Sequence, residues 1–156
     1  MAAKLLAERE RNTRELEDLV VADLPLLPVH GDFHRFNLLW EGSRISGIVD
    51  WDACRRDALV ADIAPLLMPF LPLEAELARA LLEGYQSVRR LSEQERGLLL
   101  PMVRTSLLWW VGMLLGRWDG QGEPPAGIER TLGERWTALE AAEPGLRAIL
   151  SVQNGT

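Results

Sequence analysis

Cysteine, lysine and histidine are all scarce in this chain of 156 residues. Cys54 has no second cysteine with which to form an internal disulfide, which fits a reducing compartment. The single lysine is Lys4, so sixteen of the 17 lysine and arginine residues are arginines. Only two histidines are present, His30 and His34, so a zinc site would have to be completed by carboxylates. A zinc hydrolase is therefore disfavoured.

An excess of positive charge is also missing. The formal net charge is −6, whereas a nucleic-acid partner calls for a basic surface, so we expect none. The amino-terminal stretch is charged throughout and does not have the pattern of a signal peptide. Residues 98–115 have the length of a membrane span, but Arg104 near the bilayer centre would cost about 2.5–3.5 kcal/mol. We therefore expect a buried core helix, no membrane partner and a cytoplasmic location.

Hydrophobic periodicity predicts a mostly helical chain. An amphipathic helix is expected over 3–20, followed by a break at Pro25 and Pro28. Two short apolar runs around the turn "EGSR" predict a β-hairpin, with strands over 38–40 and 45–49. The later helical segments are expected over 57–70, 73–90, 92–118 and 128–142, with a short terminal helix after them. The predicted class is mainly α with a small β-hairpin (α+β), in one domain over residues 1–156.

Several finer features of these helices are also predicted. Ser92 and Glu95 have capping-box spacing, and Pro101 predicts a kink or a division into two helices. Pro144 and Gly145 are expected to end a helix. Two sets of apolar residues are expected to face the interior: Leu73, Leu77, Leu81 and Val88, and the cluster Trp109, Trp110, Met113 and Trp118. The tryptophan cluster leaves a ligand pocket as the alternative.

The stretch "VHGDFHRFNLLW", residues 29–40, holds both histidines and the most chemically suggestive spacing. Triad catalysis is disfavoured, because no G-x-S-x-G elbow is present. Phosphoryl transfer needs a carboxylate for the hydroxyl proton and oxygen ligands for nucleotide-bound magnesium. Asp32 and Asn37, five residues apart, meet the first need and half of the second, and Asp50 after the hairpin offers the other ligand. The alternative is that all three are turn-forming polar residues.

The ordered pair "HGDFHRFN" and "IVDWDACRRDALVADIA" resembles the aminoglycoside phosphotransferase and choline kinase family. Its members share the protein-kinase-like fold and often read H-G-D-x-H-x-x-N, then I-D-W, then further aspartates. The matching positions are His30, Gly31, Asp32, His34 and Asn37, then Val49, Asp50 and Trp51, then Asp57 and Asp62. The resemblance covers residues 29–64 strongly, and the helical remainder agrees in pattern.

The resemblance implies a role for each matched residue. Asp32 is the implied catalytic base, and His34 an implied catalytic and phosphate-contacting residue. Asn37 and Asp50 are the implied magnesium ligands, so Asn37 also binds the ATP cofactor complex. His30 is expected to brace the loop, and Asp62 to anchor it by hydrogen bonds from the start of its own helix. The implied activity is transfer of the ATP γ-phosphate to a hydroxyl of a small molecule such as an aminoglycoside, choline, homoserine or a sugar.

The sequence departs from the family pattern in three places. Arg35 and Phe36 stand where members often have Pro-Gly, and the glycine expected before Asp57 is missing. Residues 1–29 read as a helix and a proline-rich turn, without a glycine-rich loop or a strand lysine. The expectation is a carboxy-terminal lobe with the amino-terminal lobe absent, which would bind Mg2+ and ATP weakly.

Two hypotheses follow from these departures. One is a phosphotransferase lobe completed by a missing amino-terminal-lobe partner or by a homodimer mate, because an uncovered lobe face is partly apolar. The other is a non-catalytic remnant or pseudoenzyme that acts as a binding or assembly module.

Overall fold

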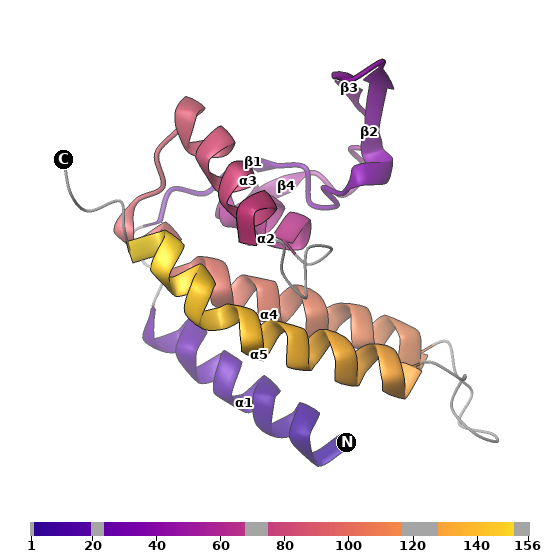
Figure 1. Ribbon diagram of the computed structural model, residues 1–156, viewed down its shortest axis with the longest axis vertical. Coiled ribbons are helices and arrows are strands. Elements are labelled where there is room, and N and C mark those ends of the chain that lie inside the picture. The colour runs from indigo at the N-terminus through magenta and orange to yellow at the C-terminus, as the bar shows by residue number, and fades with distance from the viewer. Residues whose placement is uncertain (1, 20–23, 68–74, 117–127, 152–156) are drawn as a thin grey trace.

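The computed structural model of the chain describes residues 2–19, 24–67, 75–116 and 128–151 (Figure 1). The elements, in chain order, are α1 (Ala2–Asp18), β1 (Leu27–Val29), the 3-10 helix η1 (Arg35–Asn37), β2 (Leu38–Glu41), β3 (Arg44–Ile48), β4 (Arg55–Asp57), α2 (Val60–Leu67), α3 (Ala75–Val88), α4 (Glu93–Gly116) and α5 (Ile128–Ser151). The predicted class, mainly α with a small β part, is confirmed.

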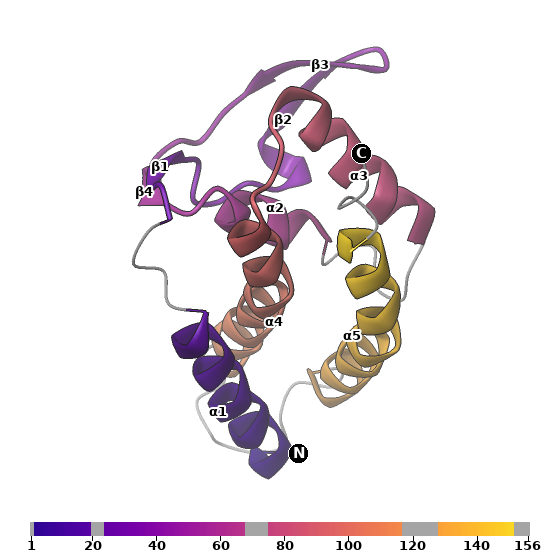
Figure 2. The ribbon, with the colours of Figure 1, turned by 90° about the vertical axis from the view of Figure 1, so that its left-hand side faces the viewer.

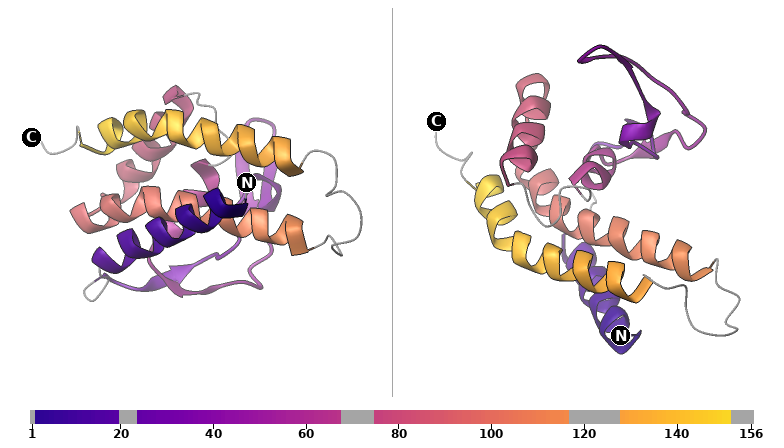
Figure 3. Two further views of the ribbon diagram at one scale, coloured as in Figure 1. Left: turned by 90° about the horizontal axis from the view of Figure 1, so that it is seen from below. Right: turned by 45° about the vertical axis from the view of Figure 1, so that its right-hand side comes forward.

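Three helices, α1, α4 and α5, form a layer that we call the helical base. Helix α4 packs against α1 on one side and α5 on the other, and it also contacts α2 (Figures 2 and 3). Its leucines and valines supply much of the core, including Leu99, Val103 and Leu107, each at most 1% exposed. Leu139 and Leu146 of α5 join the same cluster. This confirms the prediction that the apolar stretch after residue 98 is a buried core helix.

The start of α4 has the capping box that its sequence predicts. The Glu95 backbone N–H donates to Ser92 Oγ at 3.1 Å, and the Ser92 N–H donates to Glu95 Oε2 at 2.8 Å. Burial alone would raise the pKa of Glu95, but hydrogen bonds from Arg89 and Ser92 outweigh it and leave that pKa below its usual value. The reciprocal bonds satisfy donors that a helix start otherwise leaves open.

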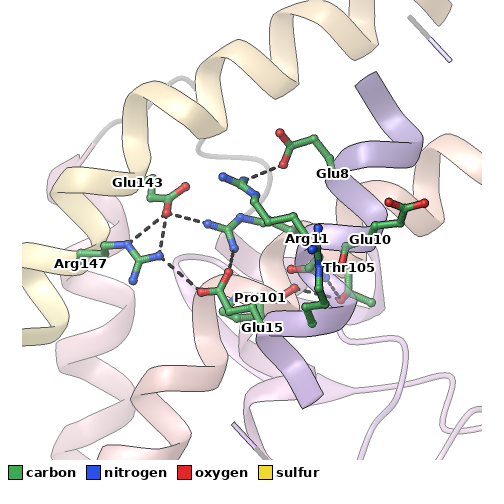
Figure 4. Close-up of polar contacts among 11 residues, drawn as sticks. Glu8, Glu10, Arg11, Glu15, Pro101, Thr105, Glu143 and Arg147 are labelled. Atoms are coloured by element: carbon green, nitrogen blue, oxygen red, sulfur yellow. Dashed lines mark hydrogen bonds and ion pairs between the residues drawn. The ribbon is translucent and has the colours of Figure 1, made fainter. Parts of the chain in front are cut away.

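A buried arginine joins the three helices of the base. Arg104 of α4 is 1% exposed, and its guanidinium pairs with Glu15 of α1 and, at 2.6 Å, with Glu143 of α5. Arg147 of α5 reaches both carboxylates from the outer side, as Figure 4 shows. Burial tends to raise the pKa of Glu143, but bonds from Arg104 and Arg147 hold it below its usual value.

The four strands in the described part of the chain form two antiparallel pairs. The predicted hairpin is confirmed as β2 with β3, in a register that pairs Leu38 with Ile48 and Glu41 with Arg44. Its turn contains Gly42 at a φ of +62°, a conformation that favours glycine. Strand β1 pairs with β4, which the sequence did not predict, because strands of three residues carry little periodicity. The hairpin projects away from the helical base (Figures 1 and 2).

Two predicted helix faces are wrong in part: Leu81 packs against the core and Trp110 and Met113 are half-buried, but other members of each set are exposed. On α3, Val88 is 91% and Leu77 is 43% exposed, and the buried residues are instead Ala78 and Leu82. Leu73 lies outside the described residues. On α4, Trp109 is 67% exposed, so it does not pack in the core. Trp118 lies outside the described residues.

Neither Pro144 nor Pro101 divides its helix. Helix α5 runs unbroken through Pro144, contrary to the predicted break. Ala142 and Leu146, on either side of Pro144, are both buried in the core, and their packing outweighs the hydrogen bond that a proline removes. Likewise α4 is one helix through Pro101, not two. In the part of the chain that the structure describes, no helix has the length and apolarity needed to cross a bilayer.

Candidate active site

The candidate loop, residues 30–37, begins where β1 ends. Val29, the last residue of β1, pairs with Arg55 of β4, so the loop starts beside the segment that follows the hairpin. Val29 is 1% exposed and His30 is 2% exposed, which anchors this end of the loop in the protein. The loop then returns to the surface and ends in η1, from which β2 begins.

Asp62, in the first turn of α2, holds the start of this loop. Its Oδ2 accepts the His30 backbone N–H at 2.6 Å, and its Oδ1 accepts the Gly31 N–H at 2.9 Å. A carboxylate that accepts two amide hydrogens in this way makes charge-assisted hydrogen bonds, which are stronger than neutral ones. The anchoring role predicted for Asp62 is confirmed.

Gly31 occupies a position that a side chain would not fit. Its φ is +83°, and a Cβ placed on it would lie 2.2 Å from the Ala53 carbonyl oxygen. The glycine therefore lets the loop pass directly against the backbone that follows the hairpin. This close approach joins the two halves of the motif that are separate in sequence.

His30 braces the loop from below, as predicted. Its Nε2 lies 2.9 Å from the Val49 carbonyl oxygen, which can only accept, so Nε2 carries the hydrogen. Its Nδ1 then accepts the Asp32 backbone N–H at 3.3 Å. The ring also contacts Trp51, with centroids 4.6 Å apart. His30 thus connects the loop to the residues on both sides of Asp50.

Asp32 and His34 lie together on the exposed side of the loop. The distance from His34 Nε2 to Asp32 Oδ2 is 3.5 Å. The His34 side chain is 40% exposed and the Asp32 side chain is 53% exposed. The Asp32 backbone is held through His30, whereas its carboxylate is open to solvent and to an incoming hydroxyl group. This combination suits a general base, since the carboxylate is positioned without being buried.

Asn37 is buried and oriented by its own loop. Its Nδ2 donates to the Asp32 carbonyl oxygen at 2.9 Å, and its backbone carbonyl accepts the Val49 N–H at 3.0 Å. The amide nitrogen is therefore used internally, which directs the opposite atom, Oδ1, away from that bond. Asn37 joins Asp32 of the loop and Val49 at the end of the hairpin in one hydrogen-bonded unit.

Asp50 follows directly on that unit and has an unusual backbone. Its φ is +64°, the one positive value at a non-glycine position among the described residues. Such conformations cost free energy and persist where the surroundings impose them, often at functional sites. Val49, the preceding residue, is held by both His30 and Asn37. The two halves of the motif therefore determine where Asp50 lies.

The oxygen donors fit magnesium by their chemistry. Asn37 Oδ1 and the exposed Asp50 carboxylate are hard oxygen ligands, and Mg2+ is usually bound by one or two protein oxygens together with phosphates and water. The described residues hold no group of three or more His, Cys, Asp and Glu side chains arranged around a metal position. A nucleotide-bound magnesium does not need such a group. Its chemistry, when bound, would be to neutralise the phosphate charge.

A cavity of about 440 Å³ lies between the loop and α2 and α3. Its lining includes His30, Phe33, Trp51, Leu81 and Tyr85, and it is mostly apolar. Burial raises the pKa of the Tyr85 phenol, although Arg89 partly offsets this, so Tyr85 stays protonated at neutral pH. The cavity therefore offers room for a small molecule beside the candidate loop, with a hydroxyl donor in its wall.

Three residues after the hairpin take part in the site although their spacing did not suggest it. Arg55 donates from Nη1 to the Gly31 carbonyl oxygen at 3.3 Å, and Ala53 sets the close approach at Gly31. Asp57, matched only as an acidic position, pairs with Arg55 at 2.9 Å. Only the pairing of β4 with β1 brings these residues to the loop, and strands of three residues are too short to be predicted from the sequence.

With this geometry in place, the comparisons with known proteins are informative. A family model described as "Phosphotransferase enzyme family" matches residues 2–98, which include the loop, the hairpin and Asp62. The chain belongs to this family. The family-level resemblance predicted from the two motifs is thereby confirmed.

The curated relatives of this phosphotransferase-family chain include several bacterial proteins. Homoserine kinases of Brucella melitensis biotype 2 and Brucella abortus strain S19 are each 32% identical over 155 residues, with 91% of this chain and 47% of the relative covered. Homoserine kinase of Brucella melitensis biotype 1 is 34% identical over 139 residues, which covers 81% of this chain and 43% of the relative. The chain spans about half the length of the curated relatives it matches.

Proposed function

We propose that this chain carries the catalytic face of a phosphotransferase that moves the γ-phosphoryl group of Mg-ATP to a hydroxyl of a small molecule. The observation that carries the proposal is the hydrogen-bonded unit of Asp32, Asn37 and Val49. In it Asn37 bonds the backbone of Asp32, whose carboxylate is open to solvent, and the backbone of Val49, the residue before Asp50. Family membership and the homoserine kinase relatives support the same class of chemistry.

Each residue has a defined part in the proposed reaction. The acceptor oxygen attacks the γ-phosphorus while the bond from that phosphorus to the β–γ bridging oxygen breaks, releasing ADP. Asp32 accepts the hydroxyl proton as the new O–P bond forms. Asn37 Oδ1 and the Asp50 carboxylate would hold the magnesium, and His34, 3.5 Å from Asp32, would contact the transferred phosphoryl group.

The acceptor is proposed to be a small alcohol, with homoserine first because the relatives bear that name. The apolar cavity beside the loop supports an acceptor with an aliphatic part. A choline-like or sugar alcohol belongs in the same test.

The test is a coupled ADP-release assay on the purified chain with Mg-ATP and each acceptor, paired with calorimetric titration of Mg-ATP. Asp32→Asn is expected to lower transfer by at least about a hundredfold while Mg-ATP binding persists. Asp50→Asn is expected to weaken Mg-ATP binding itself. Asp52→Asn, an exposed carboxylate two residues further on, is the matched control and should leave both unchanged.

One observation favours a second candidate, a non-catalytic binding or assembly module. Nine of the thirteen exposed large hydrophobic side chains among the described residues fall within residues 26–51, around the candidate loop. An apolar surface of this kind is typical of an interaction face. If no acceptor is phosphorylated and Mg-ATP does not bind, with or without a co-purifying partner, the binding module is the better account.

A further inference from the structure

We propose that Arg55 is a positioning residue that holds the peptide between Gly31 and Asp32 and thereby aims the Asp32 carboxylate. This inference rests on the proposed function, because it assigns a task to the site described there. It concerns a residue that is not one of the matched family positions, in the short strand β4 that follows the hairpin.

The Arg55 guanidinium is held at one side and donates at the other. Its Nε and Nη2 lie 3.0 Å and 2.9 Å from Asp57 Oδ2, while Nη1 donates to the Gly31 carbonyl oxygen at 3.3 Å. Asp57 is itself fixed, because its Oδ1 accepts the Ala58 backbone N–H at 2.8 Å. The planar guanidinium therefore spans from Asp57, the last residue of β4, to the candidate loop in one rigid fork.

The bond that Arg55 makes completes the restraint of one particular peptide group. The Asp32 N–H of that peptide donates to His30 Nδ1, and the Gly31 carbonyl of the same peptide accepts from Arg55. The preceding amides of His30 and Gly31 are held by Asp62. Rotation of this peptide would swing the Asp32 side chain, and Arg55 is the only one of these partners that restrains its carbonyl end.

The arrangement favours a geometric role for Arg55 over a purely electrostatic one. Its side chain is 48% exposed, and its charge is balanced by Asp57 at 2.9 Å, so little net positive charge remains for a phosphate. A lysine at position 55 would keep the charge but could not span Asp57 and Gly31 with one fork. Charge and geometry can therefore be separated by substitution.

The experiment compares Arg55→Gln, Arg55→Lys and the matched control Arg56→Gln. Arg56 is the neighbouring arginine, and it bonds the Leu26 carbonyl, outside the candidate loop. With Mg-ATP and homoserine, both Arg55 variants are expected to lower kcat about tenfold with the KM for ATP within about twofold, because a misaimed base slows the chemical step. Arg56→Gln should keep the wild-type kcat.

Amide hydrogen exchange provides a second readout that does not depend on activity. Exchange at the Asp32 amide should accelerate about tenfold in both Arg55 variants and remain unchanged in Arg56→Gln, with the Leu99 amide of α4 as the reference for an intact fold.

Each result bears on the proposal. A wild-type kcat in Arg55→Gln would overturn it. So would a lowered kcat in Arg55→Gln together with a wild-type kcat in Arg55→Lys, because charge alone would then be sufficient. If the wild-type chain transfers no phosphate, the proposed function fails, and the Asp32 exchange rate alone decides whether Arg55 holds the peptide.

Discussion

The helical base and the layer above it are held together by different means. The base, α1, α4 and α5, buries leucine and valine side chains around one buried arginine. The upper part, which we call the loop layer, comprises residues 24–58, and its order comes chiefly from hydrogen bonds between backbone groups and the side chains of Asp62, His30 and Asn37. It leaves Phe36 76% and Trp40 57% exposed. The base is therefore held mainly by apolar burial, whereas the loop layer is held mainly by hydrogen bonds and leaves large apolar side chains exposed.

This contrast predicts that the largest loss of stability comes from the base. Arg104→Ala removes a buried cation and leaves Glu15 and Glu143 facing each other, at an expected cost of about 3–5 kcal/mol in unfolding free energy. Arg147→Ala removes a 56% exposed partner of the same carboxylates and should cost below about 1 kcal/mol. Urea unfolding followed by circular dichroism measures both. Equal losses would mean that the network is not anchored at Arg104.

In the loop layer, the strongest effect is expected from the tight passage at Gly31. Gly31→Ala combines a positive φ with a Cβ 2.2 Å from the Ala53 carbonyl oxygen, so the expected cost is about 3 kcal/mol. Gly42→Ala has a similar φ of +62° but no atom within 4 Å of the added Cβ, and should cost about 1 kcal/mol. The difference in urea midpoints isolates the clash. If the two variants behave alike, the segment after the hairpin moves aside easily.

Loss of the Asp62 anchor is expected to loosen the loop layer more than the base. Asp62→Asn keeps one acceptor oxygen but turns an NH2 group toward a backbone N–H, at an expected cost of about 2 kcal/mol. Hydrogen exchange should accelerate at His30 and Gly31 but not at Leu99 in the base. Asp52→Asn, the exposed control, should change stability by less than about 0.5 kcal/mol. Uniform acceleration across both layers would contradict the separation drawn between them.

The smallest expected effect is a loss of unfolding free energy at acid pH that comes from two carboxylates of the helical base. The pKa values of Glu95 and Glu143 are lowered in the folded chain, so their contribution is full above the unfolded value of about 4.5. That contribution is lost as the pH falls from there through the lowered folded values, because the unfolded chain then binds protons more readily. Unfolding free energy measured from pH 7 to pH 3 should decline below about pH 4.5. Glu143→Gln should flatten this decline, and an unchanged slope would argue against the pairing with Arg104.

The features that sequence predicted well are local ones. The capping box of Ser92 and Glu95, the hairpin around Gly42 and the anchoring by Asp62 all depend on short spacings or on two ordered motifs. The capping box and the hairpin form between residues a few positions apart, and the Asp62 anchor belongs to the ordered family motif. The catalytic and magnesium-binding roles of Asp32, His34, Asn37 and Asp50 stay predictions.

The features that sequence missed depend on what lies opposite a residue. Val88 is apolar and at helical spacing, yet it is 91% exposed, and Trp109 is 67% exposed. Pro144 predicted a break, but the residues around it pack into the core and the helix continues. The β1–β4 pairing has no periodicity to announce it and joins residues about 30 positions apart.

The sequence by itself determined the family, the helical class and the residue types available for chemistry, since these follow from composition, periodicity and motif order. Only the tertiary structure decided which of those residues act together. Asp50 has a strained backbone because Val49 is held by His30 and Asn37, and the Gly31 carbonyl is bonded by an arginine 24 residues away. The physical reason is that hydrogen bonds and close contacts between distant segments depend on their relative position in space, which no local spacing encodes.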